Sequence, residues 1–382
     1  MLRSMTNTIS GTCDPRFEAV RTQFRANLDN GLDVGASVAL VLGGELVVDL
    51  WGGTIDDAGT PWAEDTLINV WSTTKTMTAL CVLILADQGE IDFDAPVAKY
   101  WPEFAANGKG NVLVRHLMSH TAGLPGWDTP LTVDDILDWE KNTSLLAAQA
   151  TWWEPGTASG YHAVSQGQLL GELVRRVTGQ TLGTFFAKEV AGPLGADFHI
   201  GTPESADSRV ALVIPPSTGL AGVDIDPTSI AGRTFLSTPL TADASWTIPW
   251  RRAELPAANG HGNARSVALA QSVLAGRGET RGVRLLSEAG CMKVFEEQCN
   301  GTDLVLGMPL RHGIGYGLPL PELPISPNEH ACYWGGWGGS LCINDLDANL
   351  TFTYVMNRMG EGTTGDLRGG SLLMAAYGGL AG

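Results

Sequence analysis

The chain has 382 residues, of which 44% are hydrophobic and 17% charged, enough apolar material for a large globular core. Its 24 basic and 41 acidic side chains give a formal net charge of −17, which repels phosphate backbones and excludes nucleic acid as an expected partner. Because the N-terminus lacks an apolar signal segment and no apolar run could span a bilayer, we expect a cytoplasmic protein with no membrane partner.

The N-terminal part of the chain predicts a helix, a β-hairpin and a second helix. A Gly43-Gly44 turn separates the two hairpin strands, and Gly89 is a typical stop for the second helix. The expected elements are a helix at Phe17–Leu28, strands at Ala36–Leu42 and Leu46–Gly53, and a helix at Thr73–Gln88.

The middle of the chain predicts helices between Pro and Gly breaks, and the C-terminal part predicts strands between two helices. The expected elements are helices at Thr132–Asn142, Ser165–Thr178, Ser266–Ala275 and Gly370–Tyr377, and strands at Tyr316–Leu320, Ser340–Asn344 and Leu350–Asn357. Strands at both ends favour one sheet built from the two termini. We therefore predict an α/β domain from residues 1–90 and 257–382, a mainly helical domain from 91–256, and an active site in the cleft between them.

A serine and a lysine stand three positions apart in Ser72-Thr-Thr-Lys75, where an apolar helix is expected to begin. Residues with this spacing share a helix face, which suits a serine nucleophile whose proton is taken by the amine. The spacing alone is also compatible with a helix capped by its early hydroxyls and carrying a solvated lysine. A serine so placed is expected roughly 0.4 times by chance in this chain, so other motifs must decide.

Two further segments bear on this motif. Tyr161 follows a Pro-Gly loop and leads into the Ser165–Thr178 helix, so its phenol could face a cleft and relay a proton if a nearby lysine lowered its pKa; an ordinary buried tyrosine is the alternative. The run Tyr333–Ser340 places four glycines and two tryptophans before a strand. Such glycines allow close approach of the backbone to a ligand and an exposed N–H for an oxyanion, or simply form a tight turn.

Other candidate residues receive structural assignments. His116 and His120 have the i,i+4 spacing of a zinc pair but lack an evident third ligand, and Ser165 lacks the first glycine of a Gly-x-Ser-x-Gly motif. The six cysteines show no paired short spacing and are expected to be reduced thiols. We predict no metal and no cofactor.

The order Ser-x-x-Lys, Tyr, then a Gly-Gly strand entry resembles the serine β-lactamase-like superfamily, and more narrowly class C β-lactamases, DD-peptidases and family VIII carboxylesterases. The resemblance runs from about residue 15 to the end. It includes the stretches Leu117–Pro125, Gly179–Phe186 and Gly192–Gly195. It implies a β-lactamase/transpeptidase-like fold of the α/β plus α class: an antiparallel sheet flanked by helices, with a second, mainly helical lobe.

The resemblance also implies roles for single residues. Ser72 would be the acylating nucleophile, and Lys75 its proton acceptor or the group that lowers its pKa. Tyr161 would shuttle the proton to the leaving group and activate the deacylating water. The oxyanion hole would use the backbone N–H of Ser72 and of Trp337. Lys75 must be neutral to act as a base, so desolvation and a nearby phenol have to depress its pKa.

Two departures from the lactamase pattern favour a neutral ester as substrate. Trp334-Gly335-Gly336 stands where class C lactamases have Lys-Thr-Gly, so the cation that would bind a β-lactam carboxylate is missing. Tyr161-His162-Ala163 replaces Tyr-x-Asn; His162 could supply a hydrogen bond in place of the amide, or be structural. Trp-Gly-Gly resembles the family VIII pattern.

These observations predict a serine carboxylesterase acting on short- to medium-chain esters through a Ser72 acyl-enzyme. A β-lactamase or amide hydrolase, an acyltransferase and a non-catalytic penicillin-recognising module are the alternatives; the intact Ser-Lys-Tyr set argues against the last. A small-molecule ester is the expected partner, and the sequence leaves the oligomeric state open. Substrate-binding residues are expected at Trp334, Gly335, Gly336, Trp337 and His162, within a tryptophan-rich rim that also includes Trp127, Trp152 and Trp153.

Overall fold

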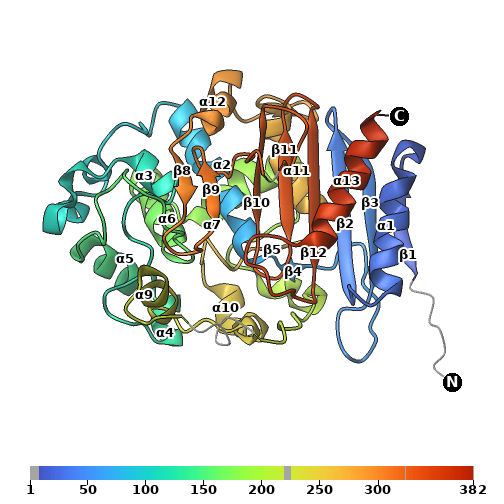
Figure 1. The fold of residues 1–382 in the computed structure, drawn as a ribbon, viewed down its shortest axis with the longest axis horizontal. Helices are drawn as coiled ribbons and strands as arrows, with labels where there is room; N and C mark the ends of the chain where they lie inside the picture. Colours follow the sequence, from blue (N-terminus) through green and yellow to red (C-terminus); the bar gives the residue numbers. More distant parts are fainter. Residues whose placement is uncertain (1–7, 219–224, 323, 382) are drawn as a thin grey trace.

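A six-stranded antiparallel sheet forms the centre of the molecule (Figure 1). The computed structural model describes residues 8–218, 225–322 and 324–381. Neighbouring strands follow the order β1-β3-β2-β12-β11-β10, so three strands come from each end of the chain. Their bounds are β1 Ile9–Cys13, β2 Gly35–Leu42, β3 Glu45–Gly53, β10 Ala331–Gly335, β11 Leu341–Asp345 and β12 Leu350–Met356.

The two halves of the sheet meet where β2 pairs with β12, from Leu42 opposite Leu350 to Ala36 opposite Met356. Almost every residue of these strands is buried, because helices cover both faces of the sheet at this point. Continuous apolar sequence rather than strict alternation is what such doubly covered strands require.

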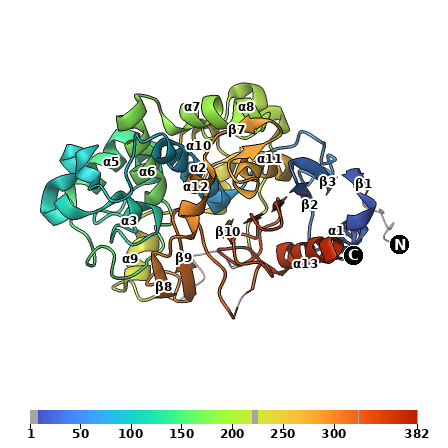
Figure 2. The same cartoon turned by 90° about the horizontal axis from the view of Figure 1, so that it is seen from above.

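Helices α1 (Glu18–Asp29) and α13 (Leu367–Ala381) lie together on one face of the sheet, and α11 (Ala264–Ala275) lies on the other (Figure 2). Beyond α11, the long helix α2 (Thr74–Asp87) is buried along nearly its whole length and contacts both α11 and α6 (Ser165–Thr178). Within the described ranges, no helix has the length and apolarity needed to cross a bilayer.

Short helices make up most of the remainder, between and around the strands and long helices. Their bounds are α3 Val114–Met118, α4 Val133–Leu137, α5 Trp139–Ala148, α7 Leu182–Phe186, α8 Gly192–Leu194, α9 Ile230–Leu236, α10 Ile248–Arg252 and α12 Glu288–Met292. Three two-stranded pairs accompany them: β4 Ile68–Asn69 with β5 His261–Gly262, β6 Glu279–Thr280 with β7 Val283–Arg284, and β8 Cys299–Thr302 with β9 Pro309–His312. The division into two domains at residues 90 and 257 stays a prediction.

Several predicted elements differ in the structure. The expected helix Thr132–Asn142 is two helices, because Asp138 leaves the helical conformation and its side chain caps α5. Tyr316–Leu320 is not a strand; it contains isolated bridges at Gly317 and Leu320 and no continuous ladder. Tyr333–Gly335, expected to lie in front of a strand, themselves belong to edge strand β10.

Candidate active site

Ser72 lies in the tight turn that starts α2. Residues Trp71–Thr73 form one 3-10 turn directly before the helix, and Trp71 takes a left-handed conformation with φ of 49°. The Thr74 hydroxyl donates to the Trp71 carbonyl at 2.5 Å and holds this turn. A non-glycine residue in that region of φ is strained and keeps this conformation only where the surrounding structure holds it. Here the conformation places the nucleophile at the start of the rigid helix α2.

The amine of Lys75 approaches the Ser72 hydroxyl at 3.1 Å from the next turn. Nζ also donates to two backbone carbonyls, of Ala163 at 2.7 Å and Ala257 at 3.0 Å. Burial of the side chain holds the pKa of Lys75 well below its usual range. A neutral amine has two N–H groups for the carbonyls and one lone pair left for the serine proton.

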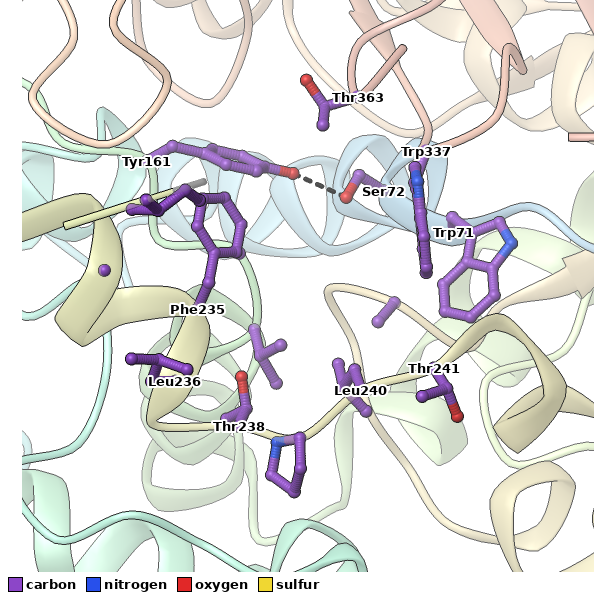
Figure 3. Close-up of a pocket in the computed structure, with 16 residues that line it drawn as sticks. Trp71, Ser72, Tyr161, Phe235, Leu236, Thr238, Leu240, Thr241, Trp337 and Thr363 are labelled. Carbon is purple, nitrogen blue, oxygen red and sulfur yellow. Dashed lines mark hydrogen bonds between the residues drawn. The ribbon is translucent and has the colours of Figure 1, made fainter. Parts of the chain in front are cut away.

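Tyr161 closes the other side of Ser72, because its phenol donates to Ser72 Oγ at 2.6 Å (Figure 3). The Tyr161 ring lies 4.8 Å from Lys75 Nζ. Its backbone is held by Asp303, whose Oδ1 accepts from the Tyr161 N–H at 3.0 Å and from the amides of Val305 and Leu306 at 2.9 Å each. A carboxylate buried in the β8–β9 connection thus positions the tyrosine.

The sequence made a proton relay through Tyr161 conditional on a pKa lowered by a nearby lysine, and the structure does not meet that condition. Burial raises the pKa of Tyr161, and this effect exceeds the opposite one of its hydrogen bond to Ser72. Tyr161 is therefore a neutral phenol beside a neutral amine. The desolvation that removes the proton from Lys75 keeps the proton on Tyr161, since burial penalises whichever form is charged.

The Gly-rich segment brings a free amide next to the nucleophile. Gly336 passes so close to the Ser72 turn that a Cβ there would collide with the Val70 carbonyl and the Ser340 hydroxyl. The next amide, that of Trp337, donates to no partner among the described residues, and the Ser72 amide sits in the first helical turn, where N–H groups lack intrahelical acceptors. Both amides are available to a substrate oxygen.

A pocket of about 380 Å³ opens at Ser72 (Figure 3). None of its sixteen described lining residues is charged, and most are apolar. Trp71 and Trp337 stack edge to face at 5.0 Å to form one wall, and Phe235 and Leu236 of α9 face them across the pocket. The remaining residues are Ser72, Tyr161, Ala163, Val164, Ile225, Gly232, Thr238, Pro239, Leu240, Thr241, Ala258 and Thr363.

His162 is not placed to bind a substrate. Its ring is fully buried, with Nδ1 bonded to the Gly160 carbonyl at 2.6 Å and Nε2 accepting from the Leu124 amide at 3.2 Å. Of its two possible roles, the structure supports the structural one. Trp334 likewise lies outside the pocket lining, packed between His120 at 5.3 Å and Tyr161 at 5.7 Å.

Most of the expected tryptophan rim is structural as well. Of its members only Trp337 lines the pocket, while Trp127 and Trp153 bond backbone carbonyls and Trp152 bonds Asp128. Sequence reasoning missed Trp71, although it adjoins the nucleophile. It also missed Phe235 and Leu236, which reach the pocket only through the tertiary fold and carry no motif.

The residues to which the sequence analysis gave structural roles make hydrogen bonds to the backbone. His116 accepts from the Leu113 amide at 3.2 Å, and Ser165 donates to the Leu124 carbonyl at 2.7 Å. No cluster of three His, Cys, Asp or Glu side chains in the described ranges could hold a metal ion. The six cysteines, all in described ranges, are unpaired.

A neutral lysine next to a serine hydroxyl can act as a base, and two free amides beside them can bind an oxyanion. This combination is what acyl transfer requires, and it places the protein among the serine hydrolases. The family model described as Beta-lactamase matches residues 24–375. The chain therefore belongs to the Beta-lactamase family.

Two relatives support this assignment, the first over most of its length and the second over about half. The chain is 35% identical over 370 residues to "Esterase/beta-lactamase LipL" of Mycobacterium tuberculosis, covering 92% of this chain and 83% of that protein. "Esterase EstB" of Burkholderia gladioli is 32% identical over 219 residues, which span 49% of this chain and 55% of the relative.

Solved structures share the whole fold. A structure described as a family VIII carboxylesterase is 44% identical and superposes with a TM-score of 0.91, covering 97% of this chain and 99% of that one. EstA from Arthrobacter nitroguajacolicus is 31% identical with a TM-score of 0.88, covering 97% and 98%. The predicted β-lactamase/transpeptidase-like fold is confirmed.

Proposed function

We propose that this protein is a carboxylesterase that hydrolyses neutral, apolar esters through an acyl-enzyme on Ser72. The observation that supports this most strongly is the Ser72 hydroxyl, held between Lys75 and Tyr161 at the mouth of a pocket whose described lining residues are all uncharged. The relatives named as esterases agree with this activity. We also propose a cytoplasmic location and a small-molecule ester as partner.

In the proposed acylation, Ser72 Oγ attacks the ester carbonyl while its proton moves to the lone pair of Lys75. The amides of Ser72 and Trp337 stabilise the oxyanion. Tyr161 then donates its phenol proton to the departing alkoxide and regains one from the Lys75 ammonium. Attack by water, with the protons moving in reverse, releases the acid and restores the serine.

We expect this esterase to have weak β-lactamase activity or none. The described pocket lining provides no cation for a lactam carboxylate, and Ala163 offers Lys75 a backbone carbonyl where lactamases have an amide side chain. Family membership nevertheless makes β-lactam turnover the second candidate function. An acyltransferase would use the same acyl-enzyme, with an alcohol in place of water.

Hydrolysis of p-nitrophenyl butyrate and of a chromogenic cephalosporin by wild type and Ser72→Ala tests the proposal. We expect ester turnover by wild type and a loss of about 10³-fold or more in Ser72→Ala, because the nucleophile is removed. Ser10→Ala, at an exposed serine on edge strand β1, is the matched control and should behave as wild type. Ester turnover that survives in Ser72→Ala, or a preference for the cephalosporin, would contradict the proposal.

A further inference from the structure

One segment, residues 225–241, supplies half of the pocket. Eight of the sixteen described lining residues belong to it: Ile225, Gly232, Phe235, Leu236, Thr238, Pro239, Leu240 and Thr241. Helix α9 occupies the middle of the segment and faces the Trp71–Trp337 wall across the pocket (Figure 3). The width of the pocket therefore depends on where α9 sits.

Arg233 ties α9 to two loops, the one that follows α3 and the one that follows α5. Its guanidinium lies over the Trp152 ring at 3.9 Å from the centroid and donates to Asp128 Oδ1 at 3.0 Å. Trp152 Nε1 donates to the same Asp128 oxygen at 2.7 Å. We call these three residues the α9 clamp.

The α9 clamp connects the pocket wall to the structure that supports Tyr161. The Trp152 amide donates to the Gly123 carbonyl at 2.7 Å, and the neighbouring Trp153 ring packs edge-on against His162 at 6.2 Å, next to the tyrosine. A second tie, from the Leu131 amide to the Ser237 carbonyl at 2.8 Å, holds the C-terminal end of α9 to the same region. The α9 wall and Tyr161 are thus held by the same region of the protein.

An isolated ion pair on the surface contributes little, because water screens it and two long side chains lose entropy. The α9 clamp differs in its geometry. One carboxylate oxygen accepts from two side chains, and the planar guanidinium is stacked on the aromatic ring, an arrangement that pre-orders the arginine. It can hold the helix in place without being needed for folding.

We propose that Arg233 is a specificity-determining, positioning residue: it holds α9 where Phe235 and Leu236 contact the acyl chain of a medium-length, uncharged ester. The inference rests on the proposed function and deepens it. The acyl chain stays bonded to Ser72 in the acyl-enzyme, so the pocket that opens at Ser72 receives it. We therefore expect the position of α9 to matter more for a long octanoyl chain than for a short acetyl group.

The test compares p-nitrophenyl acetate and octanoate hydrolysis by wild type, Arg233→Gln and Arg284→Gln. Arg284 forms an ion pair with Glu279 at 2.7 Å, similarly exposed but outside the pocket lining, and serves as the matched control. In Arg233→Gln we expect the ratio of kcat/KM for octanoate over acetate to fall by about fivefold, through a higher KM for octanoate with little change in kcat. Arg284→Gln should keep the wild-type ratio.

Salt and a conservative variant separate positioning from a merely structural role. Added sodium chloride should lower the octanoate-to-acetate ratio of wild type, since salt screens an exposed pair, and leave that of Arg233→Gln unchanged. Arg233→Lys should restore the ratio only partly, because lysine keeps the charge but not the planar stack. The melting temperatures of all variants are measured alongside.

The possible failures are distinguishable. A wild type that hydrolyses neither ester overturns the proposed function. A wild type that hydrolyses both, together with an Arg233→Gln variant whose octanoate-to-acetate ratio is unchanged or higher, overturns the role of Arg233 and leaves the esterase standing.

Discussion

Lys75 shows how the site obtains a base from an ordinarily charged side chain. Its amine has the carbonyls of Ala163 and Ala257 as acceptors, and burial alone accounts for its depressed pKa. Keeping a lysine neutral in the folded protein costs stability wherever the unfolded chain would protonate it. The base needed for acylation is therefore gained at the expense of folding free energy.

This cost predicts a pH-dependent stability difference between wild type and Lys75→Met. Unfolding takes up a proton at Lys75 between its lowered folded pKa and the usual value of about 10.4. The penalty is full below the folded pKa and disappears above the unfolded one. The unfolding free energy of wild type should therefore rise relative to Lys75→Met by up to about 1.4 kcal/mol per pH unit in this window.

Urea unfolding at about pH 8 and about pH 9.5 measures the effect. Lys188→Met is the control for the loss of a lysine side chain, because Lys188 is 66% exposed and pairs with Glu189 at the surface. A flat difference for Lys75→Met would mean that Lys75 is charged in the folded protein, and the proposed role as a base would fail.

The end of strand β10 positions the nucleophile from outside its own helix. Ser340, in the turn between β10 and β11, donates to the Val70 carbonyl at 2.9 Å and lies 2.9 Å from the Thr73 hydroxyl, so this turn and the Ser72 turn are joined on both sides of the serine. Gly336 lies between these bonds, where the backbones approach too closely for a side chain. Glycine is required here by space rather than by its backbone angles.

Gly336→Ala should therefore damage catalysis more than folding. The added methyl must displace Val70 or Ser340, and a shift of the nucleophile by a fraction of an ångström is expected to lower kcat/KM by about 10²-fold. Gly301→Ala is the matched control, because a Cβ on Gly301 meets no atom within 4 Å. Ester kinetics and thermal melts of both variants provide the measurement; wild-type kcat/KM in Gly336→Ala would show that the two backbones are not rigidly coupled.

The sequence predicted elements best where the pattern was local. The helix Ser165–Thr178 matches α6 to the residue, because Gly179 in the left-handed conformation ends it. The Asp138 break and edge strand β10 were missed. A capping residue inside a helical pattern does not interrupt that pattern in the sequence, and a Gly-rich strand has the composition of a loop.

The same limit applies to the site. Ser72, Lys75 and Tyr161 were found from motifs, and the structure brings their side chains together. The wall formed by Phe235 and Leu236 could not be found, because its place opposite Ser72 depends on how distant segments pack. Whether the pKa of Tyr161 is raised or lowered also depended on burial, which the sequence does not reveal.

At the scale of the whole molecule, elements from the N-terminal and C-terminal parts of the chain form one sheet and its helical cover. The N-terminal and C-terminal parts of the described chain pack together, since α1 contacts α13 and β2 pairs with β12 (Figures 1 and 2). Strand β11 pairs with β12 on one side and with β10 on the other, and the segment directly after β10 lies against Ser72. Stability at the C-terminal helix should therefore be linked to the integrity of a site far from it in sequence.

A core substitution in α13 tests this link. Leu372 is fully buried on this helix while Met374 is 77% exposed on it, so the two positions form a matched pair. Leu372→Ala should cost about 2–5 kcal/mol through the cavity it leaves, whereas Met374→Ala should stay within about 0.5 kcal/mol of wild type. Because the sheet joins both termini, loss of ester hydrolysis and loss of the far-ultraviolet circular dichroism signal should occur at one shared, lowered urea midpoint in Leu372→Ala. Two separate midpoints would show that α13 unfolds independently of the active site.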